Sequence, residues 1–179
     1  PVEAVELTPE FVTQLQQAAA AENLPITVRQ TDLFDPLLQL KSEHYQLAVL
    51  SEVFPHCRQV EQLRQVLRLL SQALRPGGLL LFNIFLTIEG YEPTVMEREM
   101  AQVAWSSLFT PLELATALEG LPLQLISNES VYDYEKAHLP ESTFPPTPWF
   151  EDWATGRSAF PLTTAKPPIE LRWLLCQRV

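Results

Sequence analysis

Acidic and polar side chains stand where several predicted strands of this chain end. Glu6 closes the first of these strands, Asp32 follows the second, and Ser51 and Glu52 follow the third. In an open parallel sheet, ligands bind outside the carboxyl ends of the strands. A carboxylate placed there can accept hydrogen bonds from both hydroxyls of a ribose. The pattern therefore predicts a ligand site along one edge of a sheet, with the stretch Asn83–Phe85 of the fourth strand as a further contributor.

Each of these residues also has a purely local interpretation. Glu6 stands before Thr8-Pro9, and its charge can complement the positive end of the helix that begins there. Asp32 precedes Asp35-Pro36 and can serve as a turn former. Taken singly, each residue leaves both interpretations open, whereas the repetition at successive strand ends favours a ligand site.

Composition excludes several other kinds of site. The 179 residues include only five glycines, and none of them has the G-x-G-x-x-G or G-x-x-x-x-G-K-[ST] spacing of a phosphate-binding loop. A net charge of −10 makes nucleic acid an unlikely partner, because affinity for phosphate backbones rests on Lys and Arg. Cys57 and Cys176 are too far apart in sequence to indicate a zinc site or a disulfide framework, so we expect two buried or half-buried free thiols, no metal and no disulfide.

The first ninety residues alternate between strand-like and helix-like stretches. Thr8-Pro9 is a good helix start, and Phe11, Leu15, Ala18 and Ala19 recur at helical spacing. The sequence predicts strands at 2–7, 26–30, 45–51 and 79–86, helices at 9–22 and 60–74, and a turn at 75–78. This order is typical of parallel strands joined by crossover helices. The longest apolar run, 79–88, is too short to cross a bilayer and predicts a buried strand, so no membrane association is expected.

The second half of the chain has a different character. Residues 89–109 are predicted to be irregular to weakly helical, and the capping box Thr110-x-x-Glu113 opens a helix to about Leu118. Strands are expected at 123–134 and 169–177, paired antiparallel. The stretch 138–168 holds seven of the sixteen prolines and several aromatic residues. It is too apolar for a solvated linker, so it either folds over a site as a lid or caps one edge of the core.

Several of these motifs together resemble the class I S-adenosylmethionine-dependent methyltransferases. Four motifs carry the resemblance, in the order and spacing of that family: residues 2–10, 30–32, 45–56 and 74–79. Residues 108–114 are similar to the start of the helix that follows the fifth strand there. The resemblance covers roughly 1–135 and 169–178. It implies an α/β fold in three layers, Rossmann-like and doubly wound, with a mostly parallel sheet and an antiparallel C-terminal edge hairpin, in a single domain over residues 1–179.

The resemblance also implies S-adenosylmethionine as cofactor and a role for each matching residue. Glu6 matches the acidic residue that binds the ribose hydroxyls, and Leu7 is expected against the adenine. Asp32 matches the carboxylate that accepts from the adenine amino group, with Leu33 supplying a backbone amide. The methionine moiety would pass along the stretch Ser51, Glu52 and Val53.

On the acceptor side, the stretch from Phe54 to His56 is expected to open toward a small-molecule methyl acceptor. His56 is the best-placed general base, although a lone His is more often structural. Tyr91, Trp149 and Trp153 could wall an acceptor pocket, and they could equally form the core of the flap.

The chain departs from the family at its start. The family's first strand and glycine-rich loop precede the position of Glu6 by about twenty residues, whereas this sequence begins five residues before it. Either the chain is the carboxyl-terminal portion of a longer protein, or its sheet closes the gap in another way. We favour the first, because a missing central strand would leave two ladders unpaired, and we expect the chain as given to bind the cofactor poorly. The sequence predicts a cytoplasmic methyltransferase and gives no oligomeric state. Two alternatives stay open: a non-catalytic methyltransferase-like binding or assembly domain, and a Rossmann-like enzyme using a nicotinamide cofactor.

Overall fold

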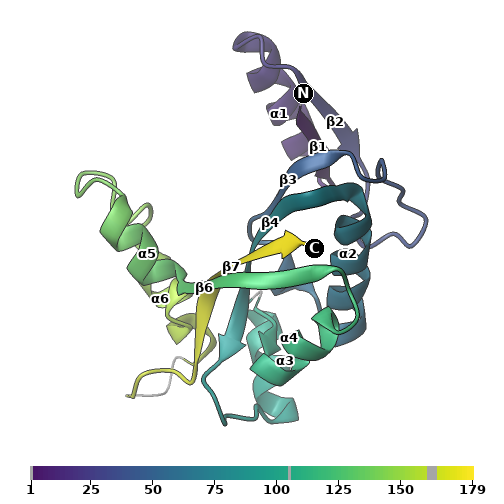
Figure 1. Ribbon diagram of the computed structural model, residues 1–179. Coiled ribbons are helices and arrows are strands. Elements are labelled where there is room, and N and C mark those ends of the chain that lie inside the picture. The colour runs from purple at the N-terminus through teal and green to yellow at the C-terminus, as the bar shows by residue number, and fades with distance from the viewer. Residues whose placement is uncertain (1, 105, 161–164) are drawn as a thin grey trace. The chain divides into compact units, whose positions relative to one another are not determined.

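The structure is a computed structural model that describes residues 2–104, 106–160 and 165–179, and the chain divides into the units Pro1–Leu40 and Lys41–Val179. Each unit is described by itself (Figure 1). The prediction of a single domain stays a prediction.

The first unit is a strand, a helix and a strand. Strand β1 (Val2–Glu6) pairs in parallel with β2 (Ile26–Gln30), and Glu6 lies level with Gln30. Helix α1 (Pro9–Ala21) connects them and begins at Thr8 with Pro9 in its first turn, as predicted. Its buried residues are Val12 and Ala19, whereas Phe11 is 56% exposed, so the prediction that Phe11 belongs to the apolar face was wrong.

The second unit is built on a five-stranded sheet. Its order is β3 (Tyr45–Leu50), β4 (Leu74–Thr87), β7 (Ile169–Arg178) and β6 (Leu123–Ser130), with the short β5 (Leu108–Phe109) also pairing with β4. Strands β3 and β5 run parallel to β4, whereas β7 is antiparallel to both β4 and β6. Figure 1 shows β7 between β4 and β6. The predicted fold class, with its antiparallel C-terminal edge, is confirmed.

Helices pack against this sheet from both sides. The short η1 (Phe54–His56) precedes α2 (Val60–Ala73), whose apolar positions are buried, and Phe54 packs edge-on against Phe82 of β4. Phe85 lies three residues further along β4, so it faces the opposite side of the strand. There it joins a core cluster with Phe150 and Ala154 of α6 (Phe150–Ala154) and with Ile169 of β7.

The structure corrects three sequence predictions. Residues 89–109 contain a regular helix, α3 (Val95–Val103), opened by a capping box of Thr94 and Glu97 that has the same spacing as the predicted one before α4 (Pro111–Leu118). The strand expected to reach residue 134 ends at Ser130, whose hydroxyl accepts from Asp133 N and caps α5 (Val131–His138).

The third correction concerns the turn predicted at 75–78. These residues belong to β4, but the ladder is irregular there, because Tyr45 pairs with Leu74 while Leu47 pairs with Leu79. The extra residues form a bulge in which Gly77 has φ +77°, a conformation that glycine adopts readily.

Candidate functional site

Glu6 and Asp32 lie at the same edge of the two-stranded sheet of the first unit. The parallel register places Glu6 level with Gln30, and Asp32 follows two residues later. Glu6 Oε1 accepts from Thr8 N at 2.7 Å, at the start of α1, and Asp32 Oδ1 accepts from Phe34 N at 2.8 Å. Both local interpretations of these residues are therefore realised. A carboxylate has about four acceptor sites, so each retains capacity for a ligand.

Two apolar residues flank these carboxylates in sequence. Leu7 is 60% exposed and Leu33 is half-buried. Exposed leucine at a strand end can cover a flat apolar ring, which is the role expected for Leu7.

In the second unit, hydrogen bonds between Glu52 and Asn83 join the end of β3 to β4. Strand β3 ends at Leu50, which pairs with Phe82, so Asn83 lies beside the residues that follow the strand. Glu52 N donates to Asn83 Oδ1 at 2.7 Å, and Asn83 Nδ2 donates back to Glu52 Oε1. Asn83 is 1% exposed, and Glu52 has φ +57°. A non-glycine residue in this conformation persists only where its surroundings hold it there.

The other oxygen of Glu52 accepts from the lid segment. Trp153 Nε1 of α6 donates to Glu52 Oε2 at 3.2 Å. The Trp153 ring packs edge-on against Phe85, with 4.9 Å between ring centroids and an interplanar angle of 88°. One carboxylate therefore links β3, β4 and α6.

The surroundings of Glu52 disfavour its charge. Burial of the carboxylate raises the pKa of Glu52 above its ordinary value, and the negative charge of Glu135 on α5 adds to this, while the bonds from Asn83 and Trp153 oppose it. The residue as a whole is nevertheless exposed. Burial also raises the pKa of Glu135, which accepts a hydrogen bond from the Trp173 side chain. Trp173 lies opposite Asn83 in the β4–β7 ladder.

The other predicted residues near β3 fall into different environments. Ser51 and His56 are exposed and Val53 is half-buried. Phe54 is 0% exposed and packs against Phe82, so the expectation that it opens toward an acceptor is corrected: its side chain is part of the core.

The three predicted wall residues are not gathered in one place. Tyr91 donates to Glu97 Oε1 of α3, and burial together with this bond raises the pKa of Tyr91 to about 12. Trp149 is 60% exposed, whereas Trp153 lies between Phe85 and Glu52. Among the hydrogen bonds of the described residues, Trp153 is the only one of these three whose side chain bonds to another predicted site residue, Glu52.

The segment 138–168 covers the face of β4 and β7 that carries Phe85. Phe150, Ala154 and Ala159 belong to the core cluster there, and Tyr132 and Phe144 pack against it. The short η2 (Arg157–Ala159) follows α6. The segment therefore caps the core, one of its two predicted roles; residues 161–164 lie outside the described residues, and its role as a lid stays a prediction.

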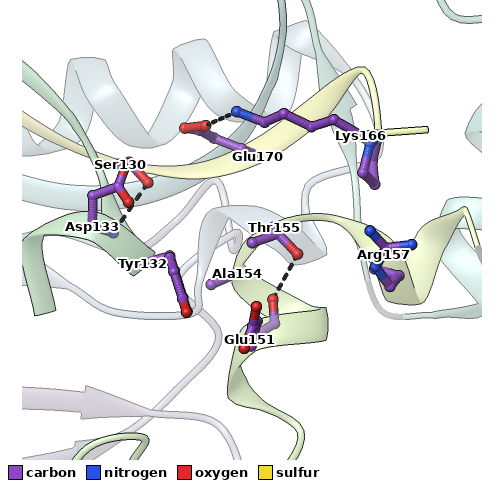
Figure 2. Close-up of a pocket in the computed structure, with 10 residues that line it drawn as sticks. Ser130, Tyr132, Asp133, Glu151, Ala154, Thr155, Arg157, Lys166 and Glu170 are labelled. Carbon is purple, nitrogen blue, oxygen red and sulfur yellow. Dashed lines mark hydrogen bonds and ion pairs between the residues drawn. The ribbon is translucent and has the colours of Figure 1, made fainter. Parts of the chain in front are cut away.

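A pocket of about 360 Å³ lies between α5, α6 and the start of β7, within the size range of ligand sites. It is lined by ten residues, nine of them labelled in Figure 2: Ser130, Tyr132, Asp133, Glu151, Ala154, Thr155, Arg157, Lys166, Pro167 and Glu170. None of the predicted site residues is among them. Lys166 pairs with Glu170 at 3.5 Å, and Arg157 pairs with Asp152 at 3.8 Å, so both cations of the pocket are engaged.

Sequence reasoning missed Glu135 and Trp173 and did not connect Asn83 or Trp153 with Glu52. No local pattern marks these relationships, because they depend on the order of strands in the sheet. Within the described ranges, no group of three or more His, Cys, Asp or Glu residues is placed to hold a metal, and no helix has the length and apolar character needed to cross a membrane.

Comparison with known proteins finds a domain match in the first half of the chain. Residues 1–82 match a family model described as a methyltransferase domain. A comparison with curated proteins found no match.

Solved structures share the fold over nearly the whole chain. A geranyl diphosphate methyltransferase in complex with S-adenosylmethionine is 14% identical, with a TM-score of 0.72, over 99% of this chain and 68% of that one. The geranyl diphosphate C-methyltransferase of Streptomyces coelicolor A3(2), with S-adenosylhomocysteine, is 12% identical, with a TM-score of 0.72, over 99% and 62%. The [4+2]-cyclase SpnF is 13% identical, with a TM-score of 0.64, over 98% and 65%.

This chain thus spans between 62% and 68% of the length of these three structures. The match over residues 1–82 includes the motifs that end β1, β2 and β3, with Glu6, Asp32 and Glu52. The methyltransferase-domain match over residues 1–82 and the fold shared with solved methyltransferases both support the resemblance to the class I S-adenosylmethionine-dependent methyltransferases.

Proposed function

We propose that this protein transfers a methyl group from S-adenosylmethionine to a small-molecule acceptor. One observation carries the proposal: the methyltransferase-domain match spans the strand ends at which Glu6, Asp32 and Glu52 stand. When bound, the cofactor supplies an electrophilic methyl group on a positively charged sulfur. The contribution expected of the protein is alignment and removal of water.

The residues of the first unit fit the donor groups of the nucleoside half. Ribose hydroxyls and the adenine amino group are hydrogen-bond donors, and the carboxylates of Glu6 and Asp32 are acceptors with capacity remaining. We assign Glu6 to the ribose hydroxyls and Asp32 to the adenine amino group. The Leu33 amide would donate to the adenine ring, and the Leu7 side chain would pack against the face of that ring.

The residues that follow β3 fit the other half. We assign Ser51, Glu52 and Val53 to the methionine moiety, because Glu52 supplies a fixed negative charge and Ser51 an exposed hydroxyl. His56, exposed at the end of η1, is the candidate base for an acceptor that must lose a proton. Trp153 and Trp149 are the candidate acceptor contacts of the lid; Tyr91 enters this role only if its bond to Glu97 opens.

The activities of similar proteins support a small-molecule acceptor. Two are geranyl diphosphate methyltransferases, and a further match, 11% identical with a TM-score of 0.66, is a putative sarcosine dimethylglycine methyltransferase from Galdieria sulphuraria. At these identities the likeness concerns the fold, so the acceptor itself stays open.

Calorimetry with S-adenosylhomocysteine tests the proposal. We expect binding by this protein, and Glu6→Ala should weaken it by about 1–3 kcal/mol, since hydrogen bonds to a charged acceptor are lost. Glu10→Ala is the matched control, because it removes the same charge from an exposed position in the first turn of α1. Absence of binding at millimolar ligand contradicts the proposal, and equal loss in the two variants contradicts the role of Glu6.

The alternative function is a non-catalytic binding or assembly role. One match with the same fold is a [4+2]-cyclase, so the fold alone does not imply methyl transfer. Incubation with methyl-labelled cofactor and a panel of small amines, alcohols and prenyl diphosphates separates the two functions. Labelled product supports the transferase, whereas binding without label transfer across the panel favours a different reaction or a binding role.

We also propose that the protein works in the cytoplasm and does not bind nucleic acid. Cys57 and Cys176 are free and buried, which suits a reducing compartment. The net charge of −10 opposes association with phosphate backbones.

A further inference from the structure

Glu52 is an anion held entirely by neutral donors. Its oxygens accept from the Asn83 amide and from the Trp153 indole. Five carboxylates take part in the ion pairs of the described ranges, and Glu52 is not one of them: Glu3, Glu43, Glu113, Asp152 and Glu170. In the part of the chain that the structure describes, the charge of Glu52 thus has no cation within ion-pair distance.

The position of this carboxylate is fixed from three directions. Its backbone, at φ +57°, donates to the buried Asn83 at 2.7 Å. Its side chain is bonded to Asn83 on one oxygen and to Trp153 on the other, and Trp153 is itself packed against Phe85. A charge fixed in this way does not have to be ordered when a ligand arrives, so more of its interaction with the ligand contributes to affinity.

The groups around Glu52 favour the binding of a positive charge. The charge of Glu135 on α5 is close enough to raise the pKa of Glu52, and Glu135 itself is bonded to the neutral indole of Trp173. Two nearby carboxylates disfavour each other's ionisation. A cation between or beside them relieves this, and indole rings tolerate a cation at their faces.

We propose that Glu52 makes the site prefer a cationic sulfur to a neutral one, with Trp153 as the residue that positions its carboxylate. The inference rests on the proposed function, which places the methionine moiety of the cofactor along Ser51–Val53. The inference gives a physical reason why the site would bind the cofactor differently before and after methyl transfer. During transfer, the bond from sulfur to the methyl carbon breaks and sulfur keeps the electron pair, while a lone pair of the acceptor forms the new bond. Sulfur thereby loses its charge and its attraction to Glu52. Glu52 therefore contributes less to binding of the product form of the cofactor than to binding of the substrate form.

Paired calorimetric titrations of S-adenosylmethionine and S-adenosylhomocysteine test this inference without needing the acceptor. The two ligands differ at sulfur by one methyl group and one charge. We expect Glu52→Gln to weaken binding of the methionine form by about tenfold and that of the homocysteine form by less than about twofold, as expected for one partly screened charge pair. Glutamine keeps an oxygen for Trp153 and the approximate shape of the side chain.

Two further variants separate positioning from general damage. Trp153→Phe removes the indole N–H and keeps a ring against Phe85, so we expect the preference for the charged ligand to shrink by a smaller factor, about threefold. Tyr134→Phe is the control, because Tyr134 is 43% exposed on α5 and has no assigned role in the site, so loss of its hydroxyl should leave both affinities unchanged.

The outcomes are distinguishable. A selective loss for the charged ligand in Glu52→Gln supports the inference, and an equal loss for both ligands overturns it. If Glu52→Gln does not fold, an unchanged preference in Trp153→Phe overturns the positioning role. Failure of the wild-type protein to bind either ligand contradicts the proposed function instead. Tetramethylammonium chloride is the last probe. If its binding is lost in Glu52→Gln while the preference between the two cofactor forms is the same as in the wild type, Glu52 binds an ammonium group of an acceptor. That result overturns the assignment of Glu52 to the sulfur.

Discussion

Glu52 and Trp153 lie 101 residues apart in the sequence and are joined by a hydrogen bond of 3.2 Å from the indole nitrogen to the carboxylate. This bond ties α6 to the strand end at which the family motif of β3 closes. It also gives the proline-rich segment a defined contact with a candidate cofactor residue. The segment thus has both a packing role, through Phe150 and Ala154, and a direct connection to the site.

The stability of the protein should depend on pH through Glu52. Because the folded protein raises the pKa of Glu52 above 4.5, it holds this proton more tightly than the unfolded chain does. Stability should therefore fall as the pH rises from about 4.5 to the folded-state pKa, the window in which only the folded protein is still protonated at this site. Because the pKa of Glu135 is raised too, urea unfolding across this window should show a fall in both proteins that is steeper in the wild type than in Glu52→Gln. Parallel curves for the two proteins would contradict the prediction.

Gly156 and Gly120 offer a matched pair of substitutions. Both have positive φ, +76° and +70°, but a Cβ at Gly156 would lie 2.4 Å from Ile169 Cγ1 and 2.9 Å from Ile169 O, whereas a Cβ at Gly120 meets nothing within 4 Å. Gly120→Ala should cost about 1–2 kcal/mol for the left-handed backbone alone. Gly156→Ala should cost about 1–3 kcal/mol more because of the clash. The difference between the two free energies of unfolding, measured by chemical denaturation, reports the clash, and equal values would contradict it.

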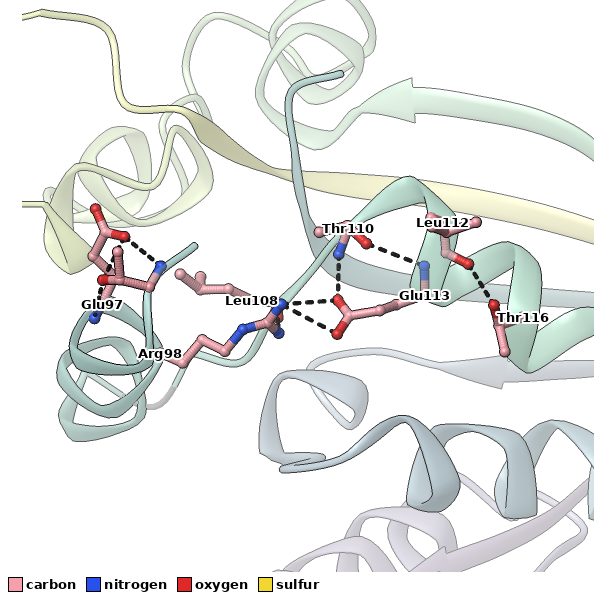
Figure 3. Close-up of polar contacts among 8 residues, drawn as sticks. Glu97, Arg98, Leu108, Thr110, Leu112, Glu113 and Thr116 are labelled. Atoms are coloured by element: carbon pink, nitrogen blue, oxygen red, sulfur yellow. Dashed lines mark hydrogen bonds and ion pairs between the residues drawn. The ribbon is translucent and has the colours of Figure 1, made fainter. Parts of the chain in front are cut away.

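The two capping boxes should differ in their contribution to stability. Thr110 is 3% exposed, and its hydroxyl accepts from Glu113 N at 3.1 Å (Figure 3). Thr110 N in turn donates to Glu113 Oε2 at 2.7 Å, and Glu113 also pairs with Arg98. Thr94 makes the same motif with Glu97 at an exposed position.

Removal of the Thr110 hydroxyl leaves the Glu113 amide without its partner at a site less exposed than that of Thr94. Thr110→Ala should therefore cost about 2 kcal/mol, near the upper end for a cap, while Thr94→Ala should cost about 0.5–1 kcal/mol because water replaces the hydroxyl. Thermal or urea unfolding of the two variants provides the comparison. A larger loss in Thr94→Ala would show that burial is not the deciding factor.

Both cysteines should be unreactive in the folded protein. Burial raises the pKa of Cys57 to about 12 and that of Cys176 to about 11, and both side chains are 0% exposed. Since the thiolate is the reactive form, a disulfide reagent such as Ellman's reagent at pH 8 should label neither thiol in the native state. In guanidinium chloride it should label both. Rapid labelling of the native protein would show that one of these core positions opens.

Local sequence patterns were sufficient for most elements. Thr8-Pro9 marks the start of α1, the apolar spacing gives α2, and the continuous apolar runs give β3 and the second half of β4. The same reasoning fails where two local signals compete. Residues 131–134 continue an apolar alternation typical of a strand, yet Ser130 and Asp133 start a helix there. The capping box of α3 has the spacing of the one before α4 and is not distinguishable from chance by spacing alone.

The sequence by itself determined the order of strands and helices in the first ninety residues, the motifs matched at 1–82 and the residues that stand at the strand ends. These features depend on periodicity, caps and turn chemistry, which act over a few residues. Tertiary structure alone decided that Asn83 and Trp153 hold Glu52, that Phe54 is core and that Tyr91 is bonded to Glu97. Such contacts depend on which strands are neighbours and on the register between them. A hydrogen bond between residues far apart in sequence is not marked by any local sequence pattern.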